Sequence, residues 1–565
     1  MRWLANRIQW RVKRVKQQDV SQPQPADAWW AAGDFPARSG CKVEPLIDGR
    51  AALYAMCVAF LTAREYILLA GWDICVDLPL VRGGDVRLGP DGSAEQERLL
   101  SLLREQGLSD EALALWSAEQ LRVVDVLGFA ARRGVRVGVL LWDAYRMSHV
   151  TNDPVEQREA LRAVGVDCVL DDSSRRITHL TQALHQKCAV VDGQVAFVGG
   201  IDLTVEVSGD YDRWDTHQHP CASIERAATN SPSAHPWHDV HTRVTGPVVA
   251  DVLTNIVQRW AEVAQRNDEP VWPADLALTP PAPVAGGVRA QVVRTIPPMT
   301  YDFAPRGIAT IKDAYIRALG MARRYVYLEN QYLWPEVFLG LDNLRWGERS
   351  DESMEVLRAM AEALARGAHV ALALPDHPNC GRRFTDGGIE WLRAQAATSG
   401  AEDRLHVYTL GNAGEDETAP GGIIYRPVYT HAKVALVDDV WWTAGSANLN
   451  SRGVHSDAEM NVIVYDPASA RDLRLRLWAE HLRREGVDHA DLADPLAGLL
   501  LLEQSARANS ARVQARQPLV GHVLPYLTED DGKRMALPVH EEHGWLDNIE
   551  GGAGAIAERH AGKYL

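Results

Sequence analysis

The stretch ALHQKCAVVDGQVAFVGGIDL, residues 183–203, decides the fold of this chain because its pattern occurs twice. Its counterpart, YTHAKVALVDDVWWTAGSANL, spans residues 429–449 and repeats the order of histidine, lysine, aspartate and a pair of small residues. Three fixed positions recur by chance at about one in several thousand starting points, and matching tails follow both copies. The chain therefore contains an internal duplication.

Two further pairs of segments extend the duplication upstream. AREYILLAGWDI at 63–74 matches ARRYVYLENQYL at 322–333, and RRGVRVGVLLWD at 132–143 matches ARGAHVALALPD at 365–376. Each half alternates amphipathic helices with short, continuously apolar strands, a pattern typical of α/β proteins. We therefore predict two pseudo-symmetric α/β sandwich domains, each a mixed sheet flanked by helices, that share one active site.

Composition indicates where the halves begin and end. Residues 267–290 contain five prolines and little periodicity, which predicts a linker. We place the first half at 45–266 and the second at 291–500. A basic lead-in covers 1–44, and the tail 501–565 has turn signals but no chemistry that the sequence identifies.

Bulk composition restricts the class of protein. The 565 residues are 46% hydrophobic and 24% charged, as in a folded protein with two large domains. A formal net charge of −16 argues against a protein that coats nucleic acid. No apolar run approaches the roughly 18 residues that span a bilayer, and the first residues lack a secretory signal core. We expect a cytoplasmic or peripheral-membrane protein, with non-classical export left open, whose seven scattered cysteines are reduced thiols.

Residues 1–16, MRWLANRIQWRVKRVK, hold six basic side chains and no acidic one. On a helix, Leu4, Ile8, Val12 and Val15 would form one apolar stripe. This pattern predicts contact with an anionic phospholipid surface, and an unstructured or packed basic terminus is the alternative.

The two copies place chemically useful side chains two positions apart. Side chains alternate faces along a strand, so His185 and Lys187 point the same way, as do His431 and Lys433. The supporting positions are Asp192 and Asp438 at the hairpin turns, and Gly200, Asp202, Ser446 and Asn448 after them. Two imidazoles, two ammonium groups and neutral donors suit an anionic phosphodiester.

The pattern His-x-Lys-x4-Asp-x6-Gly-[Gly/Ser], present twice, resembles the phospholipase D superfamily over residues 45–485. Other segments resemble those of phosphatidylcholine-type phospholipases D: YVYLENQYL (325–333), RWDTHQHP (213–220), PWHDVHTRVTGP (236–247) and LRLWAEHL (475–482). No counterpart of their N-terminal lipid-binding modules is recognisable ahead of residue 45. The resemblance therefore gives no reason to expect calcium dependence.

The resemblance implies roles for the repeated residues. His185 would attack phosphorus, and His431 would protonate the leaving alcohol and later activate water or a small alcohol. Lys187 and Lys433 would neutralise the phosphate oxygens, with no metal or other cofactor. From the residues alone, either histidine could be the nucleophile.

Each imidazole also needs a carboxylate that fixes its tautomer. Asp215 follows His185 by 30 residues and Glu459 follows His431 by 28, so we predict these two as matched partners. Ordinary surface acids are the alternative interpretation.

The residues Glu329, Asn330 and Gln331 follow an apolar strand, where ligand sites of α/β proteins collect. They are candidates for the site or for a structural network. We interpret His238 and Asp239, in PWHDVH, as structural.

The favoured function is hydrolysis of glycerophospholipids to phosphatidic acid and free headgroup, with transfer to alcohols. A phosphatidyltransferase of cardiolipin-synthase type is the nearest alternative, since a covalent phosphatidyl-histidine can be captured by any alcohol. A nuclease using the same chemistry is disfavoured by the acidic charge, and a non-catalytic scaffold by the two intact motifs.

Overall fold

A computed structural model of the chain describes residues 26–90, 92–144, 152–173, 182–204, 211–212, 235–269, 272, 276, 278–337, 347–376, 381–415, 420–483, 489–539 and 544–546. The basic segment 1–16 and Asp215 lie outside these residues. No helix in the described ranges combines the length and apolar character needed to cross a membrane.

The first half is built on one mixed sheet. Its strands, in order across the sheet, are β1 (Arg38–Ile47), β9 (Val240–Thr245), β6 (Val195–Gly199), β5 (Cys188–Val191), β2 (Tyr66–Gly71), β3 (Arg136–Trp142) and β4 (Asp167–Asp171). The pairs among β2, β3 and β4 are parallel, and the other neighbouring pairs are antiparallel. The mixed α/β sheet predicted from the apolar strands is confirmed.

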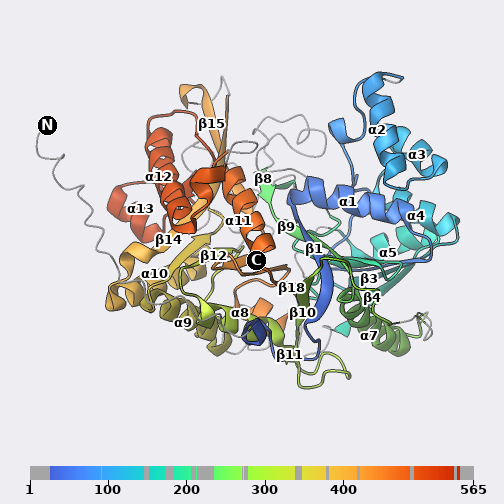
Figure 1. Cartoon of the computed structure of the whole chain (residues 1–565), viewed down its shortest axis with the longest axis horizontal. Coiled ribbons are helices and arrows are strands. Elements are labelled where there is room, and N and C mark those ends of the chain that lie inside the picture. The colour runs from blue at the N-terminus through green and yellow to red at the C-terminus, as the bar shows by residue number, and fades with distance from the viewer. Residues whose placement is uncertain are drawn as a thin grey trace, which may run out of the picture.

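The second half repeats this sheet strand for strand. The order is β10 (Val288–Ile296), β18 (Glu459–Tyr465), β17 (Trp441–Gly445), β16 (Val434–Val437), β12 (Tyr325–Glu329), β13 (His369–Ala373) and β14 (Leu405–Glu415), with the same directions. β1 also pairs with β10, which connects the two sheets at their edges (Figure 1). The arrangement is that of a duplicated α/β unit.

Helices cover the outer face of each sheet. They are α1 (Asp48–Thr62), α4 (Val123–Arg132) and α5 (Pro154–Ala163) in the first half, and α8 (Thr310–Met321), α9 (Asp351–Ala365) and α10 (Arg382–Ser399) in the second. Side chains alternate along each strand, so Ile67 and Leu69 of β2 join this outer core, whereas Leu68 joins the inner one. The inner core is shared, because one apolar cluster contains residues of both halves.

The inner faces carry α7 (Val249–Asn267) in the first half and α11 (Pro467–His481) and α12 (Pro495–Gln514) in the second. The remaining named elements are α2 (Ala94–Glu105), α3 (Asp110–Ser117), α13 (Glu529–Met535), β7 (Tyr211–Asp212), β8 (His235–His238), β11 (Ile308–Ala309), β15 (Ile423–Thr430) and β19 (Val523–Pro525). β8 of the first half pairs with β15 of the second, so the halves also exchange strand contacts beside the motifs.

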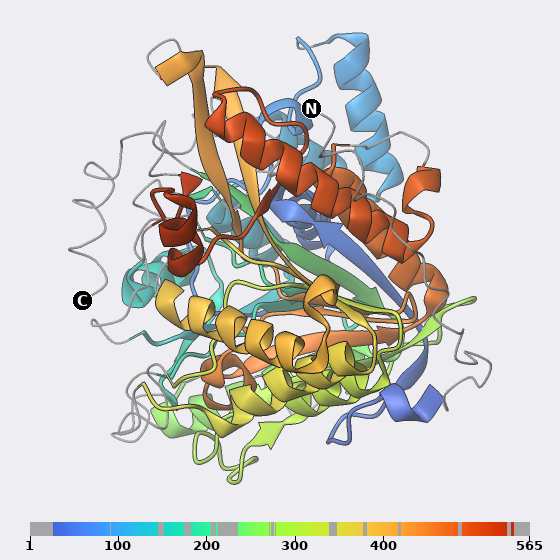
Figure 2. The same cartoon turned by 90° about the vertical axis from the view of Figure 1, so that its left-hand side faces the viewer.

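Two predicted boundaries need correction. Residue 500 lies inside α12, which crosses the second half in Figure 2, and β19 pairs with β14 of that half. Trp545 and Leu546 are buried and donate their backbone N–H groups to Asp376. The tail therefore packs on the second half as far as these residues, because its apolar side chains find partners that composition does not reveal. Residue 45 similarly lies within β1.

Candidate active site

Both motifs form the predicted hairpins. β5 and β6 are joined at Asp192 and Gly193, with φ of 52° and 64°, and β16 and β17 at Asp438 and Asp439, with φ of 54° and 53°. Two successive left-handed residues are the requirement of a tight hairpin turn whose twist matches its strands. The histidine and lysine of each motif precede the strand, which begins at Cys188 in the first copy.

The turn aspartates have a structural task. The Asp192 carboxylate accepts backbone N–H groups of Arg64, Glu65 and Tyr66 at 2.8–2.9 Å. Asp438 accepts the equivalent three, from Arg323, Arg324 and Tyr325, at 2.7–2.8 Å. These bonds tie each hairpin to the strand beside it, at the far end of β5 or β16 from the histidine, roughly 13 Å along the strand. These contacts favour a structural role over the predicted catalytic one, because motif spacing does not show which end of the hairpin holds the histidine.

We expect Asp192→Asn to lower the free energy of unfolding by about 1–3 kcal/mol, because the amide removes charge-assisted acceptors from three backbone donors. The turnover number of the folded protein should change little. Chemical denaturation and steady-state kinetics on the same preparation check both statements. A large loss of turnover at unchanged stability would restore the catalytic interpretation.

His185 is bonded to a carboxylate from the other half. Its Nδ1 lies 2.9 Å from Oε1 of Glu459, the first residue of β18, and the Ser446 hydroxyl donates to Oε2 of the same group. A carboxylate at Nδ1 keeps the ring proton there and leaves the Nε2 lone pair available for attack. Burial raises the pKa of Glu459 well above its usual range, opposed by Lys187 and Lys433. Because His185 of the first motif and Ser446 of the second both bond this carboxyl group, the two motifs meet there.

His431 shows the reciprocal pairing. Its Nδ1 lies 2.6 Å from Oδ2 of Asp239, which belongs to the first half. The predicted pairing of Glu459 with His431 is therefore wrong, and the predicted partner Asp215 lies outside the described residues. Each imidazole takes its carboxylate from the opposite half, because Thr430 pairs with His238 just before Asp239, and Leu184 forms a bridge with Ala458 just before Glu459.

Asp239 is the site residue that sequence reasoning missed. Strand register makes it the counterpart of Glu459: Gly199 pairs with His241, and Gly445 pairs with Asn461, each two residues past the acid. The acid thus lies at the start of equivalent strands, directly before β9 in the first half and as the first residue of β18 in the second. Aligning the halves through PWHDVH and the segment around Glu459 would have given this signal.

The two lysines have different partners. Lys187 Nζ lies 3.0 Å from Asp202, whereas Lys433 donates to the Gln331 side-chain oxygen at 3.2 Å. Asn448 donates to that same oxygen at 3.1 Å. Each lysine also donates to the backbone carbonyl of the histidine two residues earlier. The Asp202 contact of Lys187 is thus a charged one, whereas Gln331 and the His431 carbonyl are neutral acceptors for Lys433.

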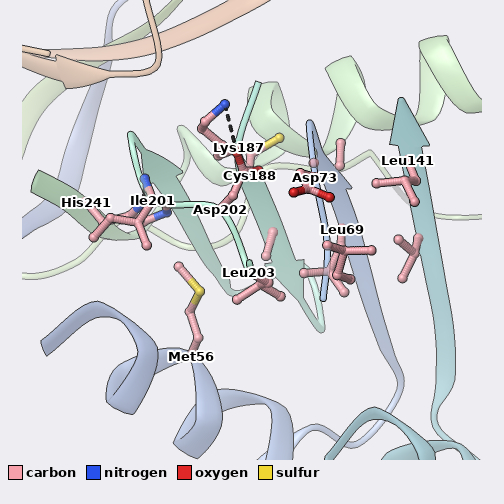
Figure 3. A pocket seen from close by; sticks show the side chains of 15 residues that line it. Met56, Leu69, Asp73, Leu141, Lys187, Cys188, Ile201, Asp202, Leu203 and His241 are labelled. Carbon is pink, nitrogen blue, oxygen red and sulfur yellow. Dashed lines mark hydrogen bonds and ion pairs between the residues drawn. The ribbon is translucent and has the colours of Figure 1, made fainter. Parts of the chain in front are cut away.

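A small pocket lies behind the first lysine (Figure 3). Its walls are apolar, with Met56, Leu69, Leu141 and Leu203, and its polar groups include Asp73, Lys187, Asp202 and His241. Burial, followed by the nearby Lys187 charge, lowers the pKa of His241 to about 3. The ring is therefore neutral at neutral pH, and it adds no charge to the site.

The three residues of the Glu-Asn-Gln segment at the end of β12 make different contacts. Asn330 accepts the backbone N–H groups of Tyr332 and Leu449 through its side-chain oxygen, which connects the segment to the end of the second motif. Gln331 accepts from Lys433 and Asn448, so it holds two candidate phosphate donors in place. The side chain of Glu329 lies in a separate buried network described below.

Aromatic rings stand beside both histidines. Trp72 contacts His185 with ring centroids 5.8 Å apart and stacks on Trp142, while Trp237 lies 4.9 Å from the His431 ring. Such contacts restrict ring rotation and exclude water from one side of each imidazole.

Gly200 leaves space for a carboxylate. A Cβ at this position would lie 2.2 Å from Oδ1 of Asp239. We expect Gly200→Ala to displace Asp239 and lower kcat by about 10²-fold, since small misplacements in a site are costly. Gly320→Ala is the control, because a Cβ there meets nothing within 4 Å and the residue lies in α8. Equal kinetics of the two variants would contradict the assignment.

Comparisons with known proteins agree with this arrangement. The family model "Phospholipase D" matches residues 113–277, and "Cardiolipin synthase, PLD-like domain" matches residues 315–479. Phospholipase D alpha 2 of Oryza sativa subsp. japonica is 26% identical over 607 residues, covering 83% of this chain and 68% of the relative. Phospholipase D alpha 3 of Arabidopsis thaliana is 24% identical over 558 residues, covering 74% and 62%.

Among solved structures, phosphatidylserine synthase of Haemophilus influenzae Rd KW20 aligns with 85% of this chain and 96% of its own, at 11% identity and a TM-score of 0.46. That similarity is too low to support an inference about function. The two family models each contain one histidine–lysine pair and together cover most of both halves. The chain belongs to the phospholipase D superfamily.

Proposed function

We propose that this protein is a phospholipase D-type phosphodiesterase that converts glycerophospholipids to phosphatidic acid and free headgroup through a covalent phosphohistidine. It would also transfer the phosphatidyl group to alcohols. The observation that carries the proposal is the reciprocal pairing of His185 with Glu459 and His431 with Asp239, each beside a buried lysine.

In the first step, Nε2 of His185 forms a bond to phosphorus while the bond from phosphorus to the headgroup oxygen breaks. His431 gives its Nε2 proton to that oxygen, so the headgroup leaves as an alcohol and not as an alkoxide. The carboxylates at the two Nδ1 atoms stabilise the positive charge on His185 as it forms and on His431 before it acts.

In the second step, the now neutral His431 removes a proton from water or an alcohol. The resulting oxygen attacks phosphorus, the phosphorus–nitrogen bond breaks, and His185 is released neutral at Nε2. Lys187 and Lys433 would stabilise the additional negative charge on the phosphate oxygens in both steps. Because charge neutralisation and proton transfer are supplied by side chains, we propose that the reaction needs no metal ion.

The match of the second half to a cardiolipin synthase domain favours a second candidate, transfer of the phosphatidyl group to a lipid alcohol. Both reactions share the first step. They differ in whether water or the hydroxyl of an acceptor lipid reaches the phosphohistidine, so the products distinguish them.

The test is product analysis by mass spectrometry. The protein is incubated in EDTA and dilute ethanol with vesicles of phosphatidylcholine, phosphatidylethanolamine and phosphatidylglycerol, beside a control with both catalytic histidines replaced by alanine. Phosphatidic acid and phosphatidylethanol are the expected products, and cardiolipin would identify the transferase. Intact lipids with every headgroup would overturn the lipid proposal and leave nucleic-acid diesters as the next substrates.

A further inference from the structure

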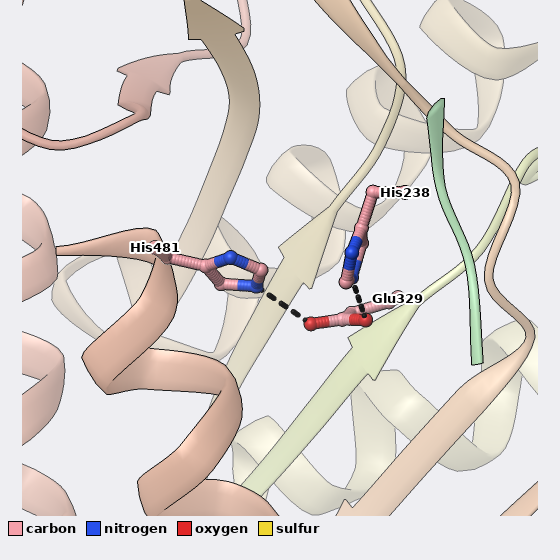
Figure 4. Close-up of side chains that lie close together, drawn as sticks. All are labelled: His238, Glu329 and His481. Carbon is pink, nitrogen blue, oxygen red and sulfur yellow. Dashed lines mark hydrogen bonds and ion pairs between the residues drawn. The ribbon is translucent and has the colours of Figure 1, made fainter. Parts of the chain in front are cut away.

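A buried chain of side chains joins the two halves behind the second histidine. His238, at the end of β8, has Nδ1 2.8 Å from Oδ1 of Asp48. Its Nε2 lies 2.9 Å from Oε2 of Glu329, which stands between His238 and His481 in Figure 4. The second oxygen of Glu329 lies 2.8 Å from His481 Nε2 and also accepts the Tyr327 hydroxyl at 2.8 Å. Asp48 and His238 come from the first half, and the other three residues from the second.

The protonation states in this buried chain of side chains follow from its geometry. With both carboxyl groups ionised, each accepts a hydrogen bond, so both ring nitrogens of His238 donate and the ring is an imidazolium. Burial alone would lower its pKa, but Glu329 and Asp48 raise the pKa of His238 well above its ordinary value. The pKa of Glu329 falls below its usual range despite burial, because His238 and His481 face it. The exposed fractions of these side chains are 0–1%, so solvent does not screen these charges.

A bound metal ion would be another way to use the same groups, since the donor atoms of His238, Glu329 and His481 lie within 4.8 Å of one another. The distances favour hydrogen bonds over coordination of a metal ion. Two ligands of one tetrahedral zinc ion stand about 3.3 Å apart, given bonds of roughly 2.0–2.1 Å. The two histidine-to-glutamate distances, 2.9 and 2.8 Å, are those of hydrogen bonds.

The buried chain of side chains is connected to the His431–Asp239 pair through backbone hydrogen bonds. The His238 carbonyl accepts the N–H groups of His431 at 2.8 Å and Ala432 at 3.2 Å. The N–H of Asp239 donates to Oδ1 of Asp48 at 3.1 Å, and the N–H of Asp48 donates to the Asp239 carbonyl at 2.8 Å. The position of both members of the His431–Asp239 pair therefore depends on His238 and Asp48.

We propose that His238, held as a cation between Asp48 of one half and Glu329 of the other, is a positioning residue for the acid–base pair His431–Asp239. The inference rests on the proposed function for its kinetic consequences only. His238 does not touch the reacting atoms in this role. It keeps the His431 ring aligned for protonating the leaving group, and its charge disfavours the imidazolium form of His431.

His238→Gln keeps the approximate volume but is uncharged, and both of its donors are on one nitrogen instead of on two separate ring atoms. We expect kcat on phosphatidylcholine to fall about 10- to 100-fold, as for other residues that orient a working imidazole, with KM changed less than about threefold. Removing a nearby cation should also move the limb of the pH profile that reports His431 to higher pH. The charged or titratable groups around His238 are Asp48, Asp239, Glu329, Tyr327, His481 and His431.

A substrate that needs no acid separates positioning from general damage. With a phosphatidyl ester of p-nitrophenol, the first step does not need His431, so the burst of p-nitrophenol should keep its wild-type rate and amplitude in His238→Gln while steady turnover slows. Tyr327→Phe, which removes one donor to Glu329, should show the same pattern more weakly. His369→Gln is the matched control. His369 bonds another histidine and begins β13, at the opposite end of that strand from Ala373, the residue that pairs with Glu329. The double variant with Glu329→Gln should cost about as much as His238→Gln alone.

The protonation state is tested without substrate. Protein labelled with nitrogen-15 at histidine should show one imidazolium with two slowly exchanging ring N–H groups up to alkaline pH, lost in His238→Gln and kept in His369→Gln. The proposal would be overturned by a neutral ring at His238, by a reduced burst amplitude in His238→Gln, or by additive losses of kcat in the double variant. Stoichiometric metal that EDTA dialysis removes together with activity would also overturn it. Wild-type protein that shows the imidazolium but cleaves no phospholipid would count against the proposed function and not against the imidazolium.

Discussion

Replacing His431 with alanine should give a protein that takes up one phosphatidyl group on His185 and then stops turning over. With a phosphatidyl ester of p-nitrophenol, the leaving group needs no proton, so His185 can still attack and release one equivalent of p-nitrophenol. The second step has lost its base, and steady turnover should fall about 10²- to 10⁴-fold. His185→Ala should release no burst at all. Stopped-flow absorbance measures the burst, and mass spectrometry of the intact protein detects the phosphatidyl group.

The two variants therefore assign the roles independently of any resemblance. A burst in His185→Ala and none in His431→Ala would exchange nucleophile and acid between the halves. Equal slow turnover without a burst in both would mean that no phosphohistidine accumulates. On phosphatidylcholine, whose alkoxide leaving group is poor, both variants should be inactive, because there the first step also needs the acid.

Replacing Asp239 with asparagine should lower kcat by about 10²- to 10⁴-fold, a loss second in size to that of the histidines. The carboxylate lies 2.6 Å from His431 Nδ1 and is buried, so an amide would remove the negative charge that stabilises the imidazolium. An amide presenting its NH2 group would also favour the wrong ring tautomer. The limb of the kcat profile that reports His431 should move to lower pH, since its imidazolium loses its counter-ion.

Asp172→Asn is the matched control for this experiment. Asp172 pairs with Arg266 on the first half with its side chain 24% exposed, and its loss should leave kcat unchanged within about twofold because partly exposed ion pairs contribute little. Steady-state kinetics across pH, with folding verified by thermal unfolding, check the prediction. Asp239→Asn with control-like kinetics would show that the pairing of His431 with Asp239 is dispensable.

The reciprocal pairing explains why the duplicated halves share one site. Each half contributes one histidine and the carboxylate for the other half's histidine, and the imidazolium of His238 lies between carboxylates of both halves. Among the described residues, neither half by itself supplies both members of a histidine–carboxylate pair. The shared apolar core and the β8–β15 contact hold these partners in register.

The sequence by itself determined the duplication, the α/β class, the two hairpins and the two histidine–lysine pairs. These features are local: strand alternation, turn chemistry and spacing are written in consecutive residues, and a repeated pattern multiplies the weak signal of each. The predicted end of the second half at residue 500 was wrong because α12 continues through it, and the extent of a domain depends on packing partners elsewhere in the chain.

Only the tertiary structure decided which acid serves which histidine. Glu459 and Asp239 are 274 and 192 residues from their imidazoles, and no spacing rule spans a contact made between two domains. The same holds for Asp192 and Asp438, whose side chains face backbone donors of neighbouring strands, and for His238, whose charge exists because two distant carboxylates are buried against it. Local sequence specifies the groups that can react, whereas burial and pairing between the halves set their protons and orientation.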